Sequence, residues 1–205
     1  VSDLVSILLI YLIGERLFNR RVGILAALFT ALSVLLIQHA HFFVVDPLAN
    51  VFILAGLYFS VRVIGQGKLS DYLLFGVMLG LAVASKISAA PLAVVVALAG
   101  LTNILCAPVD QKSAVFSRTL AFLLGAALLS LLVFRVFQPY AFEGPGFFDV
   151  KFNPKWLANM AEVRSQQAGN TDAPYALQWA DRSPVFFSLK NMLLWGLGIP
   201  LGILG

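Results

Sequence analysis

Residues 22–45 read VGILAALFTALSVLLIQHAHFFVV and residues 87–109 read ISAAPLAVVVALAGLTNILCAPV, and neither stretch contains Asp, Glu, Lys or Arg. A helix of about 20 apolar residues crosses the hydrocarbon core of a bilayer. The strands of a membrane β-barrel would instead alternate apolar and polar residues over segments of about ten. Runs such as AVVVALAGL, at 93–101, are apolar on all sides. The two stretches therefore predict membrane-spanning helices and an all-α polytopic membrane protein.

The composition of the whole chain supports this class. Of its 205 residues, 60% are hydrophobic and 12% are charged, whereas soluble domains are about 45–50% apolar and about 25% charged. So few charges cannot coat a surface in water, which excludes a soluble globule. The single cysteine, Cys106, excludes a disulfide framework within the chain. The net charge of +4 is small and its basic residues lie at segment ends, so we expect no nucleic-acid partner.

Charged residues divide the chain into seven apolar segments. Five of them lie at about 4–14, 22–38, 47–61, 119–136 and from about 190. The other two lie within 72–109, on either side of a turn at 85–91. We predict about seven transmembrane helices: six within 1–137, then one large, partly helical loop at 138–188, then a truncated seventh helix at 189–205. The chain starts at Val1 and stops at Gly205 inside an apolar run, so we expect an internal fragment of a longer protein.

The distribution of positive charge predicts the orientation. Loops 15–21, 62–71 and 106–118 hold seven basic residues, whereas the alternate short loops hold only Lys86. Cytoplasmic loops carry an excess of Lys and Arg. We therefore place these three loops in the cytoplasm and the large loop outside the plasma membrane.

The large loop is predicted to fold. It contains ten aromatic residues, and disordered segments are poor in aromatics. Asn153 followed by Pro154 is typical of a helix start, with Asn as N-cap and Pro at the first position. A structured loop of this length is usually functional.

Asp46 and Lys86 are the most informative charged residues near membrane depth. Asp46 precedes Pro47, a pair typical of the N-cap and first turn of a helix. Asp46 is equally a carboxylate at the outer membrane face, and an ionisable group there is a candidate site. Lys86 stands alone between two apolar stretches. It either snorkels to the interface or binds a lipid-linked phosphate as a compact point charge.

Arg135 is the third charged residue in this set, at the outer end of the sixth helix. It is either an interfacial anchor or part of a phosphate or sugar pocket, with Gln138, Tyr140 and Glu143 following it. A second polar group lies before the last helix and consists of Gln178, Asp181 and Arg182. Asp181 and Arg182 either belong to a binding site or pair with other charges of the loop.

His39 and His41 are two residues apart, so on a helix they point to different faces and could not share a metal, whereas on an extended strand they would align, with Asp46 near them. With no other histidine in the chain, we expect no metal centre built from this chain alone. Hydrogen bonds to neighbours are the expected role of both imidazoles.

Several stretches together resemble the GT-C superfamily of membrane glycosyltransferases, specifically the protein O-mannosyltransferase-like family 39. Residues 12–62 are similar to that family's second through fourth helices, with a basic turn, a Gly-Ala-rich helix and an Asp that opens the next helix. SKISAAPL at 85–92 resembles its Lys-containing outer turn. The segments at 138–147, 153–160 and 178–202 look like the large outer loop and following helix of a bacterial branch.

The resemblance implies transfer of a sugar from a polyprenyl-phosphate donor to a lipid, glycan or protein acceptor outside the membrane, by one inverting displacement. The family's catalytic carboxylate would lie before Val1, so the catalytic residue of this chain is unknown. Asp46 matches the family's second outer-face Asp. The aminoarabinose-transferring relatives use a loop histidine for metal, and this loop has none, so we expect no zinc and no cofactor besides the lipid-linked donor. The expected substrate-binding residues are Asp46, Lys86, Arg135, Gln138, Tyr140, Glu143, Gln178, Asp181 and Arg182.

Two other classes of protein remain as alternatives. A polytopic transporter would use charges and broken helices near the bilayer midplane, whereas here the charges cluster at segment ends. A non-catalytic membrane assembly subunit with a folded outer domain is the second alternative. The sequence names neither the sugar nor the acceptor.

Overall fold

The computed structural model describes residues 1–41, 45–144, 146, 149–170, 174 and 182–197. These residues form helices, with one isolated antiparallel bridge between Phe142 and Phe152 and no strand. The chain divides into two compact units, residues 1–137 and 138–205. The predicted all-α class is confirmed.

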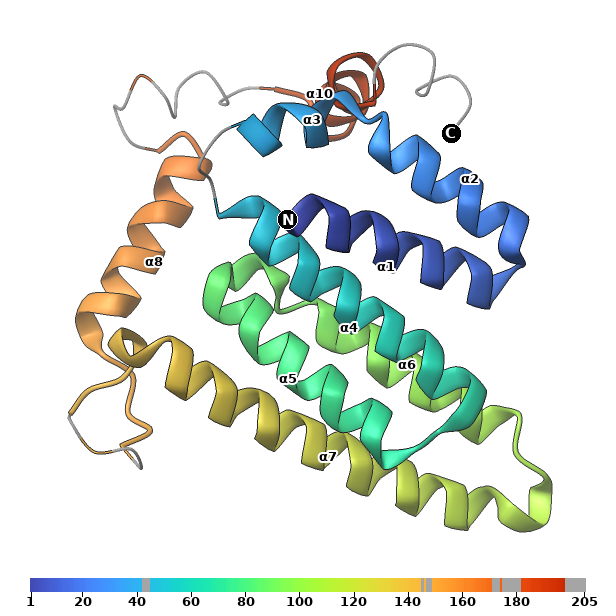
Figure 1. Ribbon diagram of the computed structural model, residues 1–205. Coiled ribbons are helices and arrows are strands. Elements are labelled where there is room, and N and C mark those ends of the chain that lie inside the picture. The colour runs from blue at the N-terminus through green and yellow to red at the C-terminus, as the bar shows by residue number, and fades with distance from the viewer. Residues whose placement is uncertain (42–44, 145, 147–148, 171–173, 175–181, 198–205) are drawn as a thin grey trace. The chain divides into compact units, whose positions relative to one another are not determined.

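The described residues of the first unit, 1–41 and 45–137, form seven α-helices and two short 3₁₀ turns (Figure 1). The α-helices are α1 (Ser2–Leu17), α2 (Arg20–Ala31), α3 (Val34–His41), α4 (Asp46–Gln66), α5 (Leu69–Ser85), α6 (Leu92–Leu105) and α7 (Lys112–Phe137), and the turns are η1 (Ile87–Ala89) and η2 (Val109–Gln111). The predicted turn at 85–91 is confirmed, because α5 ends at Ser85 and α6 begins at Leu92.

Local sequence explains where several of these helices begin and end. The Asn19 side chain accepts hydrogen bonds from the backbone N–H groups of Arg21 and Val22, at 3.0 and 3.1 Å, and caps α2. Gly67 adopts a left-handed conformation, φ 56°, that closes α4 before α5 begins. The apolar run expected as one helix at 22–38 is instead broken near Ser33 into α2 and α3.

Small residues bring the helices of the first unit close together. A Cβ atom on Gly76 or Gly80 would lie 2.4 or 2.6 Å from a carbonyl oxygen of α7, that of Ala126 or Ser130 respectively. From the first contact to the second, the residue number rises by four on α5 and by four on α7. The two helices therefore run parallel. The spacing Gly76-x-x-x-Gly80 therefore allows close packing of α5 on α7, as small residues one turn apart do in membrane helices.

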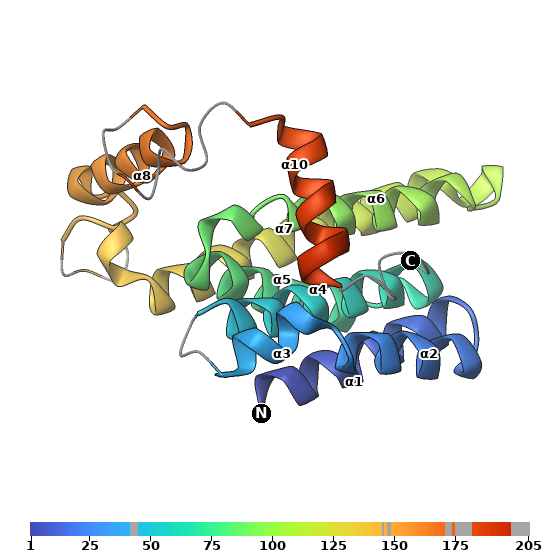
Figure 2. The same ribbon diagram turned by 90° about the horizontal axis from the view of Figure 1, so that it is seen from above.

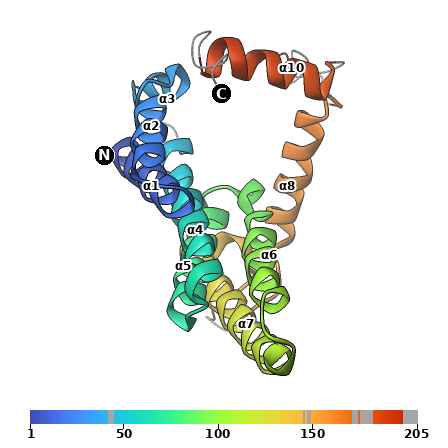
Figure 3. The same ribbon diagram turned by 90° about the vertical axis from the view of Figure 1, so that its right-hand side faces the viewer.

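The order of packing follows from these contacts. α4 lies between α1 and α5, α5 packs against α7, and α6 packs against α4 and α7 (Figure 3). α1 and α2 lie side by side and antiparallel, joined by a close approach of Gly14 to Gly23 (Figure 2). The core is a cluster of buried side chains from α4, α5, α6 and α7: Val63, Tyr72, Phe75, Leu79, Leu92, Val96, Ala99 and Ala126.

Polar contacts tie the helices at the end of the unit where α4 stops, here called the Arg62 end. Arg62 Nε lies 2.7 Å from Asp71 Oδ1, and the Asp71 side chain is fully buried. Asn103 Nδ2 of α6 donates to the Val63 carbonyl at 2.8 Å. The opposite end of the unit, where α4 begins, is called the Asp46 end.

Three helical segments of the described chain are long and apolar enough to cross a membrane: Asp46–Ile64, Ile87–Leu105 and Val109–Phe137. Leu69–Ser85 is apolar but shorter. α1 has 16 residues, about 24 Å of helix against a core about 30 Å thick, and the break near Ser33 shortens α2 and α3. The structure thus supports a membrane protein but does not confirm seven spans, which remain a prediction.

The second unit contains η3 (Pro139–Ala141), α8 (Pro154–Gln167), α10 (Pro184–Asn191) and the π-helical turn η4 (Met192–Gly196) among its described residues. Asn153 Oδ1 accepts from the Lys155 N–H at 3.0 Å and Pro154 opens α8, so the predicted helix start is confirmed. The rings of Phe142, Phe152 and Trp156 stack in sequence before and within α8, with centroids 5.4 and 5.8 Å apart.

Candidate functional site

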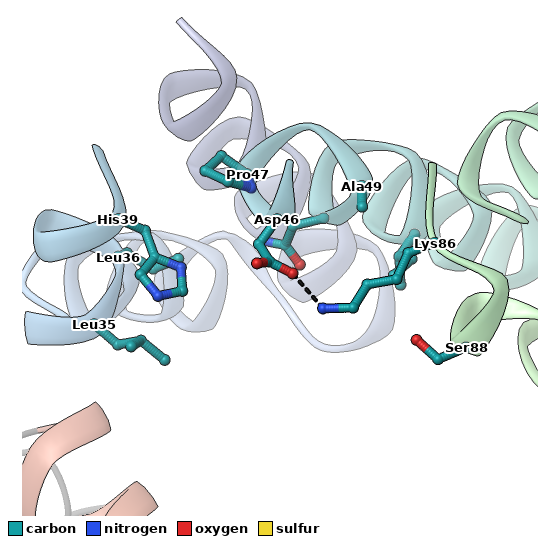
Figure 4. Close-up of a pocket in the computed structure, with 10 residues that line it drawn as sticks. Leu35, Leu36, His39, Asp46, Pro47, Ala49, Lys86 and Ser88 are labelled. Atoms are coloured by element: carbon teal, nitrogen blue, oxygen red, sulfur yellow. Dashed lines mark hydrogen bonds and ion pairs between the residues drawn. The ribbon is translucent and has the colours of Figure 1, made fainter. Parts of the chain in front are cut away.

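A pocket of about 340 Å³ lies at the Asp46 end of the first unit (Figure 4). We call it the Asp46–Lys86 pocket. Residues from α3, α4 and the turn after α5 line it: Leu35, Leu36, His39, Asp46, Pro47, Ala49, Asn50, Ile53, Lys86 and Ser88. Two of the residues expected from the sequence thus meet at one cavity although they are 40 positions apart.

Asp46 is the first residue of α4, and its carboxylate points into this pocket rather than back over the helix end. The N-cap position belongs to Val45, and no side chain caps the helix. The interpretation of Asp46 as an N-cap is therefore wrong. The carboxylate instead accepts a hydrogen bond from the Lys86 ammonium and forms an ion pair with it (Figure 4).

Lys86 reaches Asp46 because the chain leaves the helix at this residue. Its backbone is extended, φ −154° and ψ 109°, while its N–H still donates to Ala82 at 2.8 Å and closes α5. The next residues form η1, which presents Ser88 to the same pocket. The side chains of Lys86 and Asp46 are 52% and 44% exposed, so a ligand can reach both charges.

His39 and Asn50 line the pocket but were not expected there from the sequence. His39 lies on α3, on the other side of Asp46 from Lys86 (Figure 4). His41 lines a different pocket, and its Nδ1 lies 2.7 Å from the Ile37 carbonyl. The expectation that the two imidazoles point to different faces is confirmed. For Asn50 a signal was present, because it is an amide one turn after Asp46 within an apolar helix.

The chemistry of the pocket is mixed. Lys86 has three N–H donors, and Asp46 accepts from one of them. The carboxylate, the Asn50 amide, the Ser88 hydroxyl and the His39 imidazole add both acceptors and donors. An ammonium beside a carboxylate and neutral polar groups can bind a ligand that carries an anion and hydroxyl groups together.

Arg135 is half-buried in the last turn of α7. Since α5 and α7 run parallel, it lies at the same end of the unit as Lys86. It is not among the residues that line the Asp46–Lys86 pocket. The structure therefore brings Asp46 and Lys86 together but does not add Arg135 to their cavity.

The polar residues expected after Arg135 lie in the second unit. Gln138 directly precedes η3 as its N-cap residue, and its carbonyl accepts from the Ala141 N–H at 3.1 Å. The Tyr140 carbonyl accepts from Asn153 Nδ2 at 3.1 Å, and its hydroxyl from Asn159 Nδ2 at 3.4 Å.

Two charged residues of the second unit have local partners. Glu143 Oε2 lies 2.6 Å from Lys151 Nζ, and this hydrogen bond raises the pKa of the Lys151 ammonium above its ordinary value. The Arg182 guanidinium lies 4.3 Å from the centroid of the Phe187 ring, in cation–π geometry. Gln178 and Asp181 lie outside the described residues.

In the described part of the chain, no three side chains of the types His, Cys, Asp or Glu come together as metal ligands. The Asp46–Lys86 pocket holds one carboxylate and one imidazole. The ammonium of Lys86 supplies a positive charge in this pocket.

The comparisons with known proteins agree with the membrane architecture. No curated protein and no solved structure gives a significant match. Residues 1–139, which include the whole Asp46–Lys86 pocket, match the family described as dolichyl-phosphate-mannose-protein mannosyltransferase. The matched region covers well over half of the chain, so this protein belongs to the dolichyl-phosphate-mannose-protein mannosyltransferase family of membrane glycosyltransferases.

Proposed function

We propose that the protein transfers a sugar from a polyprenyl-phosphate carrier to a lipid, glycan or protein acceptor outside the membrane, and that the Asp46–Lys86 pocket binds the phosphate and sugar of that donor. The observation that carries this proposal is the accessible Asp46–Lys86 pair in a cavity at the ends of membrane-length helices. Family membership favours a glycosyltransferase over the transporter and the assembly subunit.

The reaction breaks one bond and forms another at the same carbon. A hydroxyl or amine of the acceptor attacks the anomeric carbon of the sugar, and the bond between that carbon and the phosphate oxygen breaks. The electron pair of the broken bond stays on the phosphate, and a base accepts the acceptor's proton. One displacement of this kind inverts the anomeric configuration.

Lys86 is the residue that fits the leaving phosphate. Its ammonium is a compact point charge, and charge develops on the phosphate oxygen as the bond breaks. A fixed cation stabilises that charge most where water is largely excluded. Because this ammonium supplies the positive charge, we propose that transfer needs no resident metal.

Asp46 fits the sugar and also orients Lys86. A carboxylate only accepts hydrogen bonds when ionised, which suits sugar hydroxyls and repels a phosphate. The ion pair holds the ammonium in the pocket before the donor arrives. His39 and Asn50 add polar groups on the far side of Asp46 and along α4.

Kinetics of the full-length protein test this assignment. Lys86→Met removes the charge and keeps most of the side-chain volume. A hydrogen bond to a charged group contributes about 1.5–3 kcal/mol, so kcat/KM for a polyprenyl-phosphate sugar should fall about tenfold to a hundredfold. Lys68→Met is the matched control, because Lys68 is an exposed lysine at the other end of α5.

A double-mutant cycle separates catalysis from packing. If Lys86 only neutralised Asp46, combining Lys86→Met with Asp46→Asn would restore activity, since neither charge would then be left alone. The proposal predicts that the double variant is at least as impaired as Lys86→Met, because Asp46→Asn also removes the carboxylate proposed to bind the sugar. Restored activity, or equal rates for Lys86→Met and Lys68→Met, would refute the proposed role.

A further inference from the structure

His39 is a titratable residue of the Asp46–Lys86 pocket that has no step of its own in the reaction proposed above. It is half-buried in the last turn of α3. Leu35, one turn earlier on the same face of α3, lines the pocket as well. His41 lines a separate pocket. The short helix α3 therefore presents one imidazole to the Asp46–Lys86 pocket and turns the other away from it.

The charged groups of the pocket follow one another in a defined order. Figure 4 shows the Lys86 ammonium on one side of the Asp46 carboxylate and the His39 ring on the other side. The function proposed above assigns the phosphate of the donor to Lys86 and its sugar to Asp46. His39 then lies across the sugar from the phosphate.

An inverting displacement requires a group in that place. The acceptor's oxygen attacks the anomeric carbon from the side opposite to the bond that breaks, because the reacting orbitals must align. The group that takes the acceptor's proton has to be within hydrogen-bond reach of that oxygen. The base therefore belongs on the far side of the sugar from the cation that holds the phosphate, which is the side of His39.

The other polar side chains that line the pocket are less suited to accept a proton. Asp46 already accepts a hydrogen bond from Lys86, whose ammonium has only donors. Asn50 and Ser88 carry a neutral amide and a neutral hydroxyl. A neutral imidazole has one nitrogen that accepts a proton, and histidine changes its charge between about pH 5 and 8. Among the described residues that line the pocket, His39 is thus the one with the chemistry of a general base.

We infer that His39 is the catalytic base on the acceptor side of the Asp46–Lys86 pocket; this rests on the function proposed above. The unprotonated ring nitrogen accepts a hydrogen bond from the acceptor's hydroxyl. As the new bond to the anomeric carbon forms, the proton moves to that nitrogen, and the electron pair of the broken bond stays on the phosphate at Lys86. The imidazolium then releases its proton to water.

Two histidine variants of the full-length protein test this role. His39→Gln keeps a side chain that forms hydrogen bonds but cannot take up a proton. His41→Gln is the matched control, because it removes the imidazole that lies two residues away in another pocket. General base catalysis contributes about 10²–10⁴-fold, so kcat should fall about a hundredfold or more in His39→Gln and about threefold or less in His41→Gln. The Kd for polyprenyl phosphate should stay near that of the unmodified protein in both, since Lys86 holds the phosphate.

The pH profile of kcat distinguishes a base from a residue that only supports the pocket. Two charged groups face His39 across the pocket, Asp46 from α4 and Lys86 from the turn after α5, and they pair with each other. The arginines of α2 lie in its first turn, away from α3, and Asp3 of α1 lines the other pocket. As the pH falls from about 8 to about 5, kcat of the unmodified protein should fall, because a protonated imidazole is no longer a base. His39→Gln should lose this dependence.

Azide as the acceptor gives a readout that also controls for folding. Azide has no proton to lose, so it should take the sugar at similar rates from the unmodified protein and from His39→Gln. An unchanged kcat and pH profile in His39→Gln would overturn the inference and place the base elsewhere, as the carboxylate implied by the family resemblance would be. An equal loss of transfer to azide and to a hydroxyl acceptor would overturn it as well, because His39 would then act in donor binding or folding. The function proposed above fails separately, through unchanged kinetics in Lys86→Met.

Discussion

Replacing Gly76 by alanine should separate α5 from α7 and destabilise the first unit. A Cβ atom at this position would lie 2.4 Å from the Ala126 carbonyl oxygen and 3.0 Å from its Cα. Non-bonded carbon atoms pack best about 3.5–4.0 Å apart, so the two backbones must move apart by about 1 Å. Both obstructing atoms belong to a helix backbone and cannot rotate away as a side chain could.

The magnitude follows from comparing two glycines on the same pair of helices. Overpacking a close contact costs about 1–3 kcal/mol, while alanine gains up to about 1 kcal/mol over glycine in helix propensity. Gly125→Ala has the same gain, but its Cβ would meet nothing nearer than Leu73 Cδ2 at 3.6 Å, an ordinary contact. Gly76→Ala should therefore be about 1–3 kcal/mol less stable than Gly125→Ala.

The assay is reversible unfolding of the two variants in mixed micelles, followed by circular dichroism as the fraction of denaturing detergent rises. The difference between the two free energies of unfolding cancels the propensity term, which both substitutions share. Because Lys86 directly follows α5, Gly76→Ala should also weaken donor use. If Gly76→Ala unfolds at the same detergent fraction as Gly125→Ala, the close parallel packing of α5 on α7 is refuted.

Three further predictions concern other parts of the chain. Asp71→Asn leaves the Arg62 guanidinium, 29% exposed, without its buried ionic partner. Because Arg62 stays partly solvated, the loss should be about 1–3 kcal/mol, less than for a fully buried pair, and an unchanged midpoint in the same unfolding assay would contradict this. Asn153→Ala removes the cap of α8 and should cost about 1 kcal/mol, visible as faster amide exchange in its first turn, whereas unchanged exchange would count against the cap. In intact cells, a membrane-impermeant thiol reagent should label Ser165→Cys but not Gln111→Cys, and the reverse pattern would invert the predicted topology.

The features of the fold that could be predicted from the sequence are those that residues close together in the chain determine. The all-helical class, the turn at 85–91 and the cap at Asn153 were predictable, because apolar runs, Pro and Asn act within a few residues. The break near Ser33 was not, since no Pro or Gly marks it and tertiary packing decides such breaks.

The candidate site was predictable only in part for the same reason. The types and membrane depth of Asp46 and Lys86 could be read from the sequence. Their mutual ion pair could not, because it depends on the antiparallel packing of α4 and α5 across 40 residues. His39 was missed as a pocket residue because its position depends on α3 being a separate helix. The N-cap interpretation of Asp46 failed because the local pattern of Asp before Pro competes with a distant cation that the sequence does not place.

The most direct test of the central claim is the binding of polyprenyl phosphate itself, without sugar or acceptor, to the purified full-length protein. Equilibrium titration should give a Kd for Lys86→Met about tenfold to a hundredfold above that of the unmodified protein, since one charge-assisted contact is lost. Asp46→Asn should change this Kd much less than Lys86→Met does, because it removes a carboxylate that repels the phosphate together with the contact that holds Lys86 in the pocket. Equal Kd values for Lys86→Met and the unmodified protein would contradict the account.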